Sequence, residues 1–480
     1  MKKSTRHQRT VLVLIAVTLF GAVGTARRNE AAAHPGKFVF TPIAYLGDPA
    51  PGGSNFLDVF ESNFINNRGD VLFGSNVTAN EEQGIFLLPR RGNTIAEIAR
   101  VGEPAPSGGV FGAGFGSPNA LNDKGDVGFM FLLDPLSFPI GINAGVYRYS
   151  QRTRMLTAVM TPGVTPAPEG GVFAGATFGT SLNNEGLLAF GGIVPTDIGV
   201  HLADEPYLGL GAAVYSADTQ GHISTVVGPG DPAPSGAVLD WAVFAQINAS
   251  GDVAFMGHLA GEECRPAGFP PHAVLMACLG SIYIKDGATG QLRSIAHAGD
   301  PAPGGGVYRQ AISPMLNDHG DVVFLGDLTP PPQARRVTGV YRHSNGVTLA
   351  IARPGDPMPG GGHFVTASNV IGWQISVNNP GDVAFNAVLD TDDNRDGVPD
   401  TGLFVWSHGV LRLVARTGTQ IPDIGEVAHL VMGVLVLLPS AGFVPNSGAT
   451  MNDHGQVVFG ATLSDGRGVL LVATRTHPER

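Results

Sequence analysis

A short pattern repeats seven times along this 480-residue chain. Each unit opens with a turn of the type Gly-Asp-Pro-Ala-Pro-Gly-Gly and continues through an Asn-x-x-Gly turn into an apolar segment of the type Val-x-Phe. The opening glycines are Gly47, Gly102, Gly163, Gly230, Gly299, Gly355 and, in a degraded copy, Gly418. Repeats of about 55 to 75 residues that are rich in β-branched and aromatic residues are typical of a closed ring of small sheets.

The opening turn and the Asn-x-x-Gly turn have different structural roles. An asparagine at the first position of a type I turn accepts hydrogen bonds from the following backbone, and a glycine at the fourth position closes a hairpin. Proline in the opening turn fixes φ and removes a donor, so this segment must cross from one sheet to the next. We expect four strands per unit: a short inner strand, Val-x-Phe, Gly-Val-Tyr, and an outer strand such as 349–352.

The order of these strands at the two ends of the chain predicts how the ring closes. The chain begins with a strand of the fourth kind, 38–46, and ends after one of the third kind, 469–474. Pairing them would complete the last sheet and leave no open edge. We therefore predict an all-β fold: a seven-bladed β-propeller of four-stranded blades that occupies residues 34–480 as one domain.

The first 33 residues are typical of a signal peptide. Four basic residues precede the apolar run 11–23, and the small residues 31–33 offer a cleavage site, with 24–26 as an alternative. The run is shorter than the ~20 residues of a spanning helix, although an uncleaved anchor stays open. We expect a secreted, periplasmic or cell-surface protein with no membrane insertion after cleavage.

Charge narrows the range of partners. Removing residues 1–33 lowers the 29 basic residues to 23 and the 40 acidic residues to 39, which leaves a net charge of −16. Such a balance argues against nucleic acid as a partner. Extracellular glycans, peptides or proteins remain as partner classes for a protein that we expect to be a monomer.

The only two cysteines, Cys264 and Cys278, lie in an insertion of the fourth unit. In an exported protein such a pair predicts a disulfide, and a loop of about 15 residues would gain ~3 kcal/mol from it. His272 lies between them and suggests a metal site instead. A structural zinc site requires four ligands, and the sequence has no fourth candidate ligand near these three residues.

An aspartate-rich segment, 390–400, resembles the start of a calcium loop. Asp392, Asn394 and Asp396 fall at positions 1, 3 and 5, the Val398 carbonyl at position 7 and Asp400 at position 9. Leu403 stands where the usual glutamate would complete the set. We predict a structural Ca²⁺ bound by these five residues; the alternative is a solvated acidic turn.

Other acidic residues recur in the opening turns, at Asp48, Glu103, Asp231, Asp300 and Asp356. A ring of carboxylates could attract cations, but we favour the interpretation that each residue caps its own turn. The triplet Arg68-Gly69-Asp70 matches an adhesion tripeptide, yet its glycine and aspartate belong to the repeat.

The seven Asn-x-x-Gly-x-Val-x-Phe copies resemble the bacterial choice-of-anchor tandem-repeat proteins named for an NxxGxxAF motif. Units 248–255 and 378–385 match almost letter for letter. The resemblance implies an exported or surface-displayed bacterial protein of unknown activity, and it supplies no catalytic residues. The sequence also has no H-E-x-x-H, no G-x-S-x-G and no Walker loop.

Two functions follow from these patterns. The favoured one is a non-catalytic scaffold or binding protein that uses loops on the rim of the interblade connectors, where the variable insertions fall. These are residues 132–143, 195–210, 258–280, 327–338 and 390–401. The alternative is a secreted hydrolase or lyase with an active site at the central channel, built from histidines near that rim. The candidate histidines are His258, His297, His363 and His429.

Overall fold

The computed structural model describes residues 38–57, 60–77, 82–92, 94–106, 108–134, 143–195, 210–262, 280–328, 337–367, 375–431 and 449–476. The chain divides into two compact units, 1–33 and 34–480, and the description below concerns the second. Its described residues form strands and turns without a helix. Accordingly, no helix in the described chain has the length and apolar character needed to cross a membrane.

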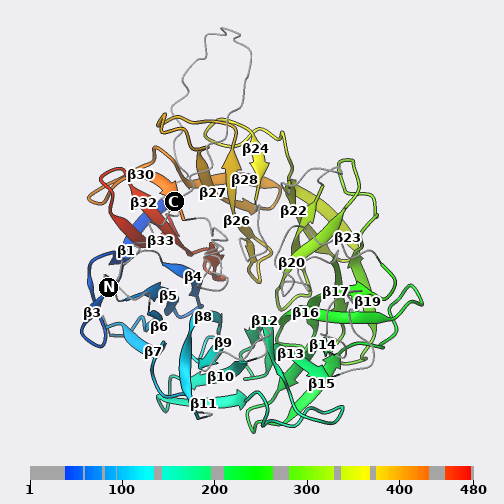
Figure 1. Ribbon diagram of the computed structural model, residues 1–480. Coiled ribbons are helices and arrows are strands. Elements are labelled where there is room, and N and C mark those ends of the chain that lie inside the picture. The colour runs from blue at the N-terminus through cyan, green and yellow to red at the C-terminus, as the bar shows by residue number, and fades with distance from the viewer. Residues whose placement is uncertain are drawn as a thin grey trace, which may run out of the picture. The chain divides into compact units, whose positions relative to one another are not determined.

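Seven sheets form the blades of a propeller around a centre, as Figure 1 shows, and each blade starts with its innermost strand. Blade 1 is β4 (Glu61–Ile65), β5 (Val71–Asn76), β6 (Gln83–Leu88) and β7 (Ala96–Arg100). Blade 2 is β8 (Val110–Leu121), β9 (Val127–Asp134), β10 (Ala144–Ser150) and β11 (Met155–Met160). Blade 3 is β12 (Gly175–Leu182), β13 (Leu188–Pro195), β14 (Leu210–Ala217) and β15 (Ile223–Val227). Blade 4 is β16 (Leu239–Ile247), β17 (Val253–Leu259), β18 (Ser281–Lys285) and β19 (Leu292–Ala296).

The remaining blades keep this order. Blade 5 is β20 (Gln310–Leu316), β21 (Val322–Asp327), β22 (Thr338–Ser344) and β23 (Val347–Ala352). In blade 6, β24 (Phe364–Thr366) and β25 (Ile375–Val377) both pair with β26 (Val383–Leu389), followed by β27 (Thr401–Ser407) and β28 (Val410–Arg416). In blade 7, β30 (Gly425–Leu430) and β31 (Thr450–Met451) both pair with β32 (Val457–Leu463), followed by β33 (Gly468–Arg475) and β1 (Phe38–Tyr45). Short strands β2 (Pro49–Ala50) and β3 (Ser54–Asn55) form a hairpin in the first connector, and β29 (Gln420–Ile421) pairs with β30.

The predicted closure is confirmed. Strands β1 and β33 pair in antiparallel fashion, from Phe38 opposite Arg475 to Tyr45 opposite Val469. Figure 1 shows the blue first strand lying in the same sheet as the red last ones. The outermost strand of blade 7 therefore comes from the start of the chain, and the seven-bladed ring has no open edge at this junction.

Aromatic side chains hold each blade to its connector. In blade 5, Phe324 of β21 stacks on Tyr341 of β22 at a centroid distance of 5.5 Å, and Tyr308 of the connector packs edge-on against Tyr341 at 5.0 Å. A larger residue at Gly339, two residues before this tyrosine, would be crowded, because its Cβ would lie 3.0 Å from the Tyr341 ring and 3.1 Å from the Ala352 carbonyl oxygen. Such aromatic groups favour this edge-to-face packing and add stability beyond their buried area.

The connectors are compact turns with their own hydrogen bonds. Gly299 N–H donates to the Tyr308 carbonyl at 2.7 Å, and Tyr308 N–H donates to the Asp300 carbonyl at 2.9 Å. The Asp300 side chain accepts from His297 N–H at 2.9 Å, and Asp48, Asp231 and Asp356 cap their turns in the same way. These four carboxylates serve their own turns, which agrees with the interpretation favoured from the sequence.

Strand order gives the propeller two faces. The connectors and the loops between second and third strands share one face, which we call the connector rim. The Asn-x-x-Gly turns and the loops between third and fourth strands share the other, which we call the turn rim. All five variable insertions join second to third strands, so they leave the blades at the connector rim.

Candidate functional site

The aspartate-rich loop joins β26 to β27 on the connector rim, and a buried ion pair holds it in place. The Asp400 carboxylate is fully buried and accepts from Arg416 Nη2 at 2.8 Å and from Thr391 Oγ1 at 2.5 Å. The same guanidinium donates to Asp393 at 2.7 Å and to the Gly361 carbonyl at 3.1 Å. Arg416 thus ties both ends of the loop to blade 6.

The middle of this loop is exposed and is folded around its own carboxylates. Asp392 accepts from the backbone N–H groups of Asp396 and Gly397, both at 3.1 Å. Asp396 accepts from Val398 N–H at 2.8 Å and hydrogen bonds to His429 Nε2 at 2.6 Å. The hydrogen bond from Val398 N–H is the main reason that the pKa of Asp396 lies below its usual value, and the contact with His429 lowers this pKa further. A charged carboxylate at Asp396 is therefore favoured.

These contacts place the predicted calcium ligands in two groups. Asp392, Asn394 and Asp396 lie together at the exposed end, whereas Asp400 faces Arg416. Within the described ranges, no three His, Cys, Asp or Glu side chains gather closely enough to hold a metal ion. Calcium binding by Asp392, Asn394, Asp396, Val398 and Asp400 stays a prediction.

The four candidate histidines each lie beside a carboxylate, which the sequence did not indicate. His258 Nδ1 lies 2.8 Å from Asp240, and its ring stacks on Trp241 with centroids 5.6 Å apart. His258 is only 1% exposed, so this pair belongs to the interior of blade 4. The other pairs are His297 with Glu262, His363 with Asp390 and His429 with Asp396. Each of the four histidines is therefore paired with a different carboxylate.

Cys264, Cys278 and His272 lie outside the described residues. The disulfide between the two cysteines stays a prediction.

On the turn rim, the repeated asparagines link all seven blades into one circle. Each Nδ2 donates to the backbone carbonyl of the equivalent asparagine in the next blade, and the last one returns to the first. The distances are 2.8 Å for Asn66 to Asn122, 3.1 Å for Asn122 to Asn183, 3.0 Å for Asn183 to Asn248, 3.3 Å for Asn248 to Asn317, 2.9 Å for Asn317 to Asn378, 3.1 Å for Asn378 to Asn452 and 2.9 Å for Asn452 to Asn66. We call this circle the inner asparagine ring.

A second circle is formed by the residue after each asparagine, and here asparagine and aspartate alternate. Its members in blade order are Asn67, Asp123, Asn184, Ala249, Asp318, Asn379 and Asp453. A backbone N–H donates to the side-chain oxygen of the next member, as from Asn379 to Asp453 at 2.7 Å. Asn67 Nδ2 bridges the carboxylates of Asp123 and Asp453 at 3.1 and 2.8 Å. Seven positions cannot alternate completely, and Ala249 stands where two like residues would meet.

These observations define the chain as a seven-bladed β-propeller closed by pairing of its first and last strands. Residues 18–479 match the family of unknown function DUF7453, and the chain belongs to that family. This match does not test the resemblance to choice-of-anchor repeat proteins. A comparison with curated proteins gave no match.

Solved structures of several kinds are similar to this chain. An oligogalacturonate lyase in complex with manganese is 14% identical, with 92% of this chain and 99% of that chain covered and a TM-score of 0.47. The β-propeller domain of the Trilobed protease from Pyrococcus furiosus is 10% identical over 88% and 97%, with a TM-score of 0.45. A puromycin-hydrolyzing peptidase of Mycobacterium tuberculosis is 11% identical over 87% and 51%, with a TM-score of 0.48. These likenesses concern the fold alone.

Proposed function

We propose that this protein is an exported, non-catalytic binding protein that takes its ligand on the connector rim. The observation that carries the proposal is the loop between β26 and β27. Its ends are fixed by the buried Asp400–Arg416 pair, while Asp392, Asn394 and Asp396 remain exposed at its tip. A fixed backbone that presents polar side chains binds at a low cost in conformational entropy.

The surroundings of His258 favour binding rather than catalysis by this histidine. The most enclosed of the candidate histidines, His258 is held between Asp240 and Trp241 inside blade 4. A general base must come within hydrogen-bond reach of a substrate proton, and a 1% exposed side chain is poorly placed for that. His258 therefore serves packing, and a hydrolase or lyase at the central channel is left as an outcome of the test.

A structural Ca²⁺ at the loop tip fits this proposal. Carboxylate, amide and backbone carbonyl oxygens are the ligands that Ca²⁺ prefers, and Asp392, Asn394, Asp396 and Val398 offer them. Asp400 would keep its pair with Arg416. The ion would neutralise the exposed carboxylates, and an extracellular glycan, peptide or protein remains the class of partner.

The test uses purified residues 34–480 on an array of extracellular polysaccharides and peptides, with calcium or with a chelator. We expect calcium-dependent binding that is lost in the variant Asp392→Ala/Asp396→Ala. The matched control is Asp218→Ala/Asp286→Ala, because these aspartates cap turns between third and fourth strands, on the turn rim. Binding that survives in the loop variant would overturn this location. Release of cleavage products from a bound polysaccharide would favour the hydrolase or lyase.

A further inference from the structure

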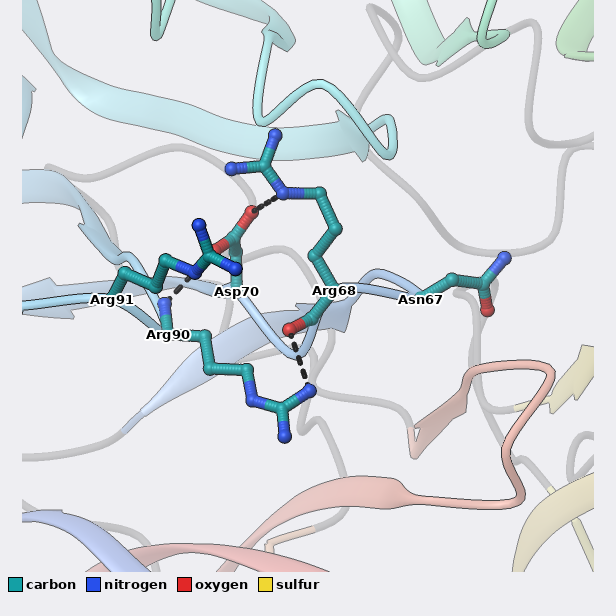
Figure 2. Close-up of a pocket in the computed structure, with 5 residues that line it drawn as sticks. All are labelled: Asn67, Arg68, Asp70, Arg90 and Arg91. Atoms are coloured by element: carbon teal, nitrogen blue, oxygen red, sulfur yellow. Dashed lines mark hydrogen bonds and ion pairs between the residues drawn. The ribbon is translucent and has the colours of Figure 1, made fainter.

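A basic pocket lies on the turn rim of blade 1, on the opposite face from the proposed ligand site. Its volume is about 570 Å³, and it is lined by Asn67, Arg68, Asp70, Arg90 and Arg91. Figure 2 shows the Arg68 side chain beside the Asp70 carboxylate, whereas the Arg90 side chain extends toward the Arg68 carbonyl. Three arginines come together here in a chain whose net charge is −11. This volume falls within the range of sites that bind small molecules.

The carboxylate in the pocket is already engaged by the fold. Asp70 is 2% exposed; one oxygen accepts from Arg90 N–H at 2.9 Å and the other from Asn66 Nδ2 at 2.8 Å. The Arg68 guanidinium approaches it only to 3.7 Å. Asp70 therefore pairs with one guanidinium group at most, that of Arg68, and leaves those of Arg90 and Arg91 without a carboxylate partner among the described residues. Its burial also makes it unsuited to act in an exposed adhesion tripeptide.

Of the three arginine side chains, only that of Arg68 makes several contacts that support the fold. Arg68 Nη1 donates to the carbonyls of Asp123 and Lys124 at 3.2 Å, which ties this side chain to blade 2. Arg90 makes one long contact, 3.4 Å, to the Arg68 carbonyl. Arg91 is exposed and makes no hydrogen bond or ion pair to any residue that the structure describes. Most guanidinium donors of Arg90 and Arg91 therefore face the pocket or solvent.

Comparison between blades separates what the fold needs from what blade 1 adds. The structural role of residue 90 is carried by its backbone, because Gln151 and Gly287 donate the same N–H to Asp126 and Asp252. In the other units the position of Arg68 holds Lys124, Glu185, Ser250, His319, Pro380 and His454. The positions of Arg90 and Arg91 hold Gln151 and Arg152, Thr219 and Gln220, Gly287 and Ala288, Asn345 and Gly346, His408 and Gly409, or Arg475 and Thr476. No unit besides the first has arginine at more than one of these three positions.

We infer that the pocket binds a small polyanionic ligand through carboxylate or phosphate groups. Guanidinium groups present paired N–H donors that match the two oxygens of such groups, and they bind them with charge-assisted hydrogen bonds. Arg90 and Arg91 supply these donors, and Arg68 forms the wall toward blade 2. The inference does not depend on the proposed function, because the two sites lie on opposite rims and share no residue.

The test is calorimetric titration of residues 34–480 with citrate, inorganic phosphate and a diuronic acid, with neutral maltose as the blank. We expect at least one anion to bind, with an affinity that falls as salt is added. Binding of citrate or phosphate alone would identify the ligand as a free small anion. Binding of the diuronic acid alone would identify it as an acidic sugar. The variant Arg90→Gln/Arg91→Gln should weaken that binding by about tenfold or more.

Arg293→Gln is the matched control, because it removes one exposed arginine from β19 of blade 4 and should leave binding unchanged. Arg91→Gln alone keeps the test valid if the double variant does not fold, since this side chain has no partner among the described residues. The inference is overturned if no anion binds at about 10 mM, or if Arg293→Gln weakens binding as much as the pocket variants do.

Discussion

The inner asparagine ring makes a quantitative prediction at Asn317, which is 4% exposed. Its Oδ1 accepts from His319 N–H at 3.0 Å and Asp321 N–H at 2.9 Å. Its Nδ2 donates to Asp321 Oδ2 and to the Asn378 carbonyl, both at 2.9 Å. Four hydrogen bonds, three of them buried, at about 1 kcal/mol each predict that Asn317→Ala lowers the free energy of unfolding by about 3–4 kcal/mol.

The variant Asn317→Asp separates the two functions of this side chain. It keeps the oxygen that accepts from the turn but replaces the amide donor by an oxygen that faces Asp321 and the carbonyl of the next blade. At neutral pH two carboxylates would then meet, so we expect a loss at least as large as that of alanine. The loss should shrink at acidic pH, because a protonated aspartate can donate again.

Guanidinium denaturation followed by fluorescence measures both variants, with Asp218→Ala as the control. Asp218 caps the turn before His222 by accepting from Gln220 N–H at 2.8 Å and His222 N–H at 2.9 Å. Its side chain makes these turn contacts in an exposed position without a bond to another blade, so its replacement should cost less. An Asn317→Ala variant no less stable than Asp218→Ala, or an Asn317→Asp variant of wild-type stability at neutral pH, would refute the role of the ring.

Four further predictions follow. Deleting residues 34–45 removes β1 and exposes the edge of β33. In chemical denaturation, the unfolding midpoint should therefore fall far more than it does after deletion of residues 477–480. Equal midpoints for the two deletions would contradict ring closure. The variant Ala249→Asn supplies an amide oxygen that can accept from the Asn184 N–H and an amide N–H that can donate to Asp318, so it should stabilise the protein by about 1 kcal/mol. The variant Ala249→Asp places a second carboxylate beside Asp318 and should stabilise the protein less or not at all. Millimolar calcium should raise the melting temperature by mass action, and Asp392→Ala/Asp396→Ala should abolish the increase while Asp218→Ala/Asp286→Ala preserves it. Burial above all, with Glu103 adding to it, raises the pKa of Glu97 from 4.5 to about 7; folding therefore favours the protonated acid, and stability should fall as the pH rises from 4.5 to 7. Glu97→Gln should remove about 1–2 kcal/mol of this dependence after allowance for solvent screening, as measured by denaturation at about pH 5 and about pH 8.

Blade number and closure could be predicted from the sequence because both follow from periodicity and strand order. The circle of asparagines could not. A turn explains Asn317 Oδ1 through the backbone that follows it, but the partner of Nδ2 is the carbonyl of Asn378, 61 residues along the chain. Only the curvature of the closed ring brings that carbonyl within reach.

The candidate sites show the same limit. The spacing of the aspartate-rich loop placed Asp400 with Asp392 and Asp396, yet a buried arginine, Arg416, faces it from β28. Arg68 and Arg90 are separated in sequence and lie together because β5 and β6 form a hairpin. Both arrangements depend on charged side chains from neighbouring strands, which a local pattern does not contain.

The two circles on the turn rim place different constraints on a change in the number of blades, for example by duplication of a unit. The inner circle uses the same residue in every blade, so an added copy extends it without any other change. The outer circle depends on parity: a ring with an even number of blades could alternate asparagine and aspartate throughout. An odd ring must tolerate one mismatch, which Ala249 relieves here. Gain or loss of a single blade would therefore require a compensating change in the outer circle and none in the inner one.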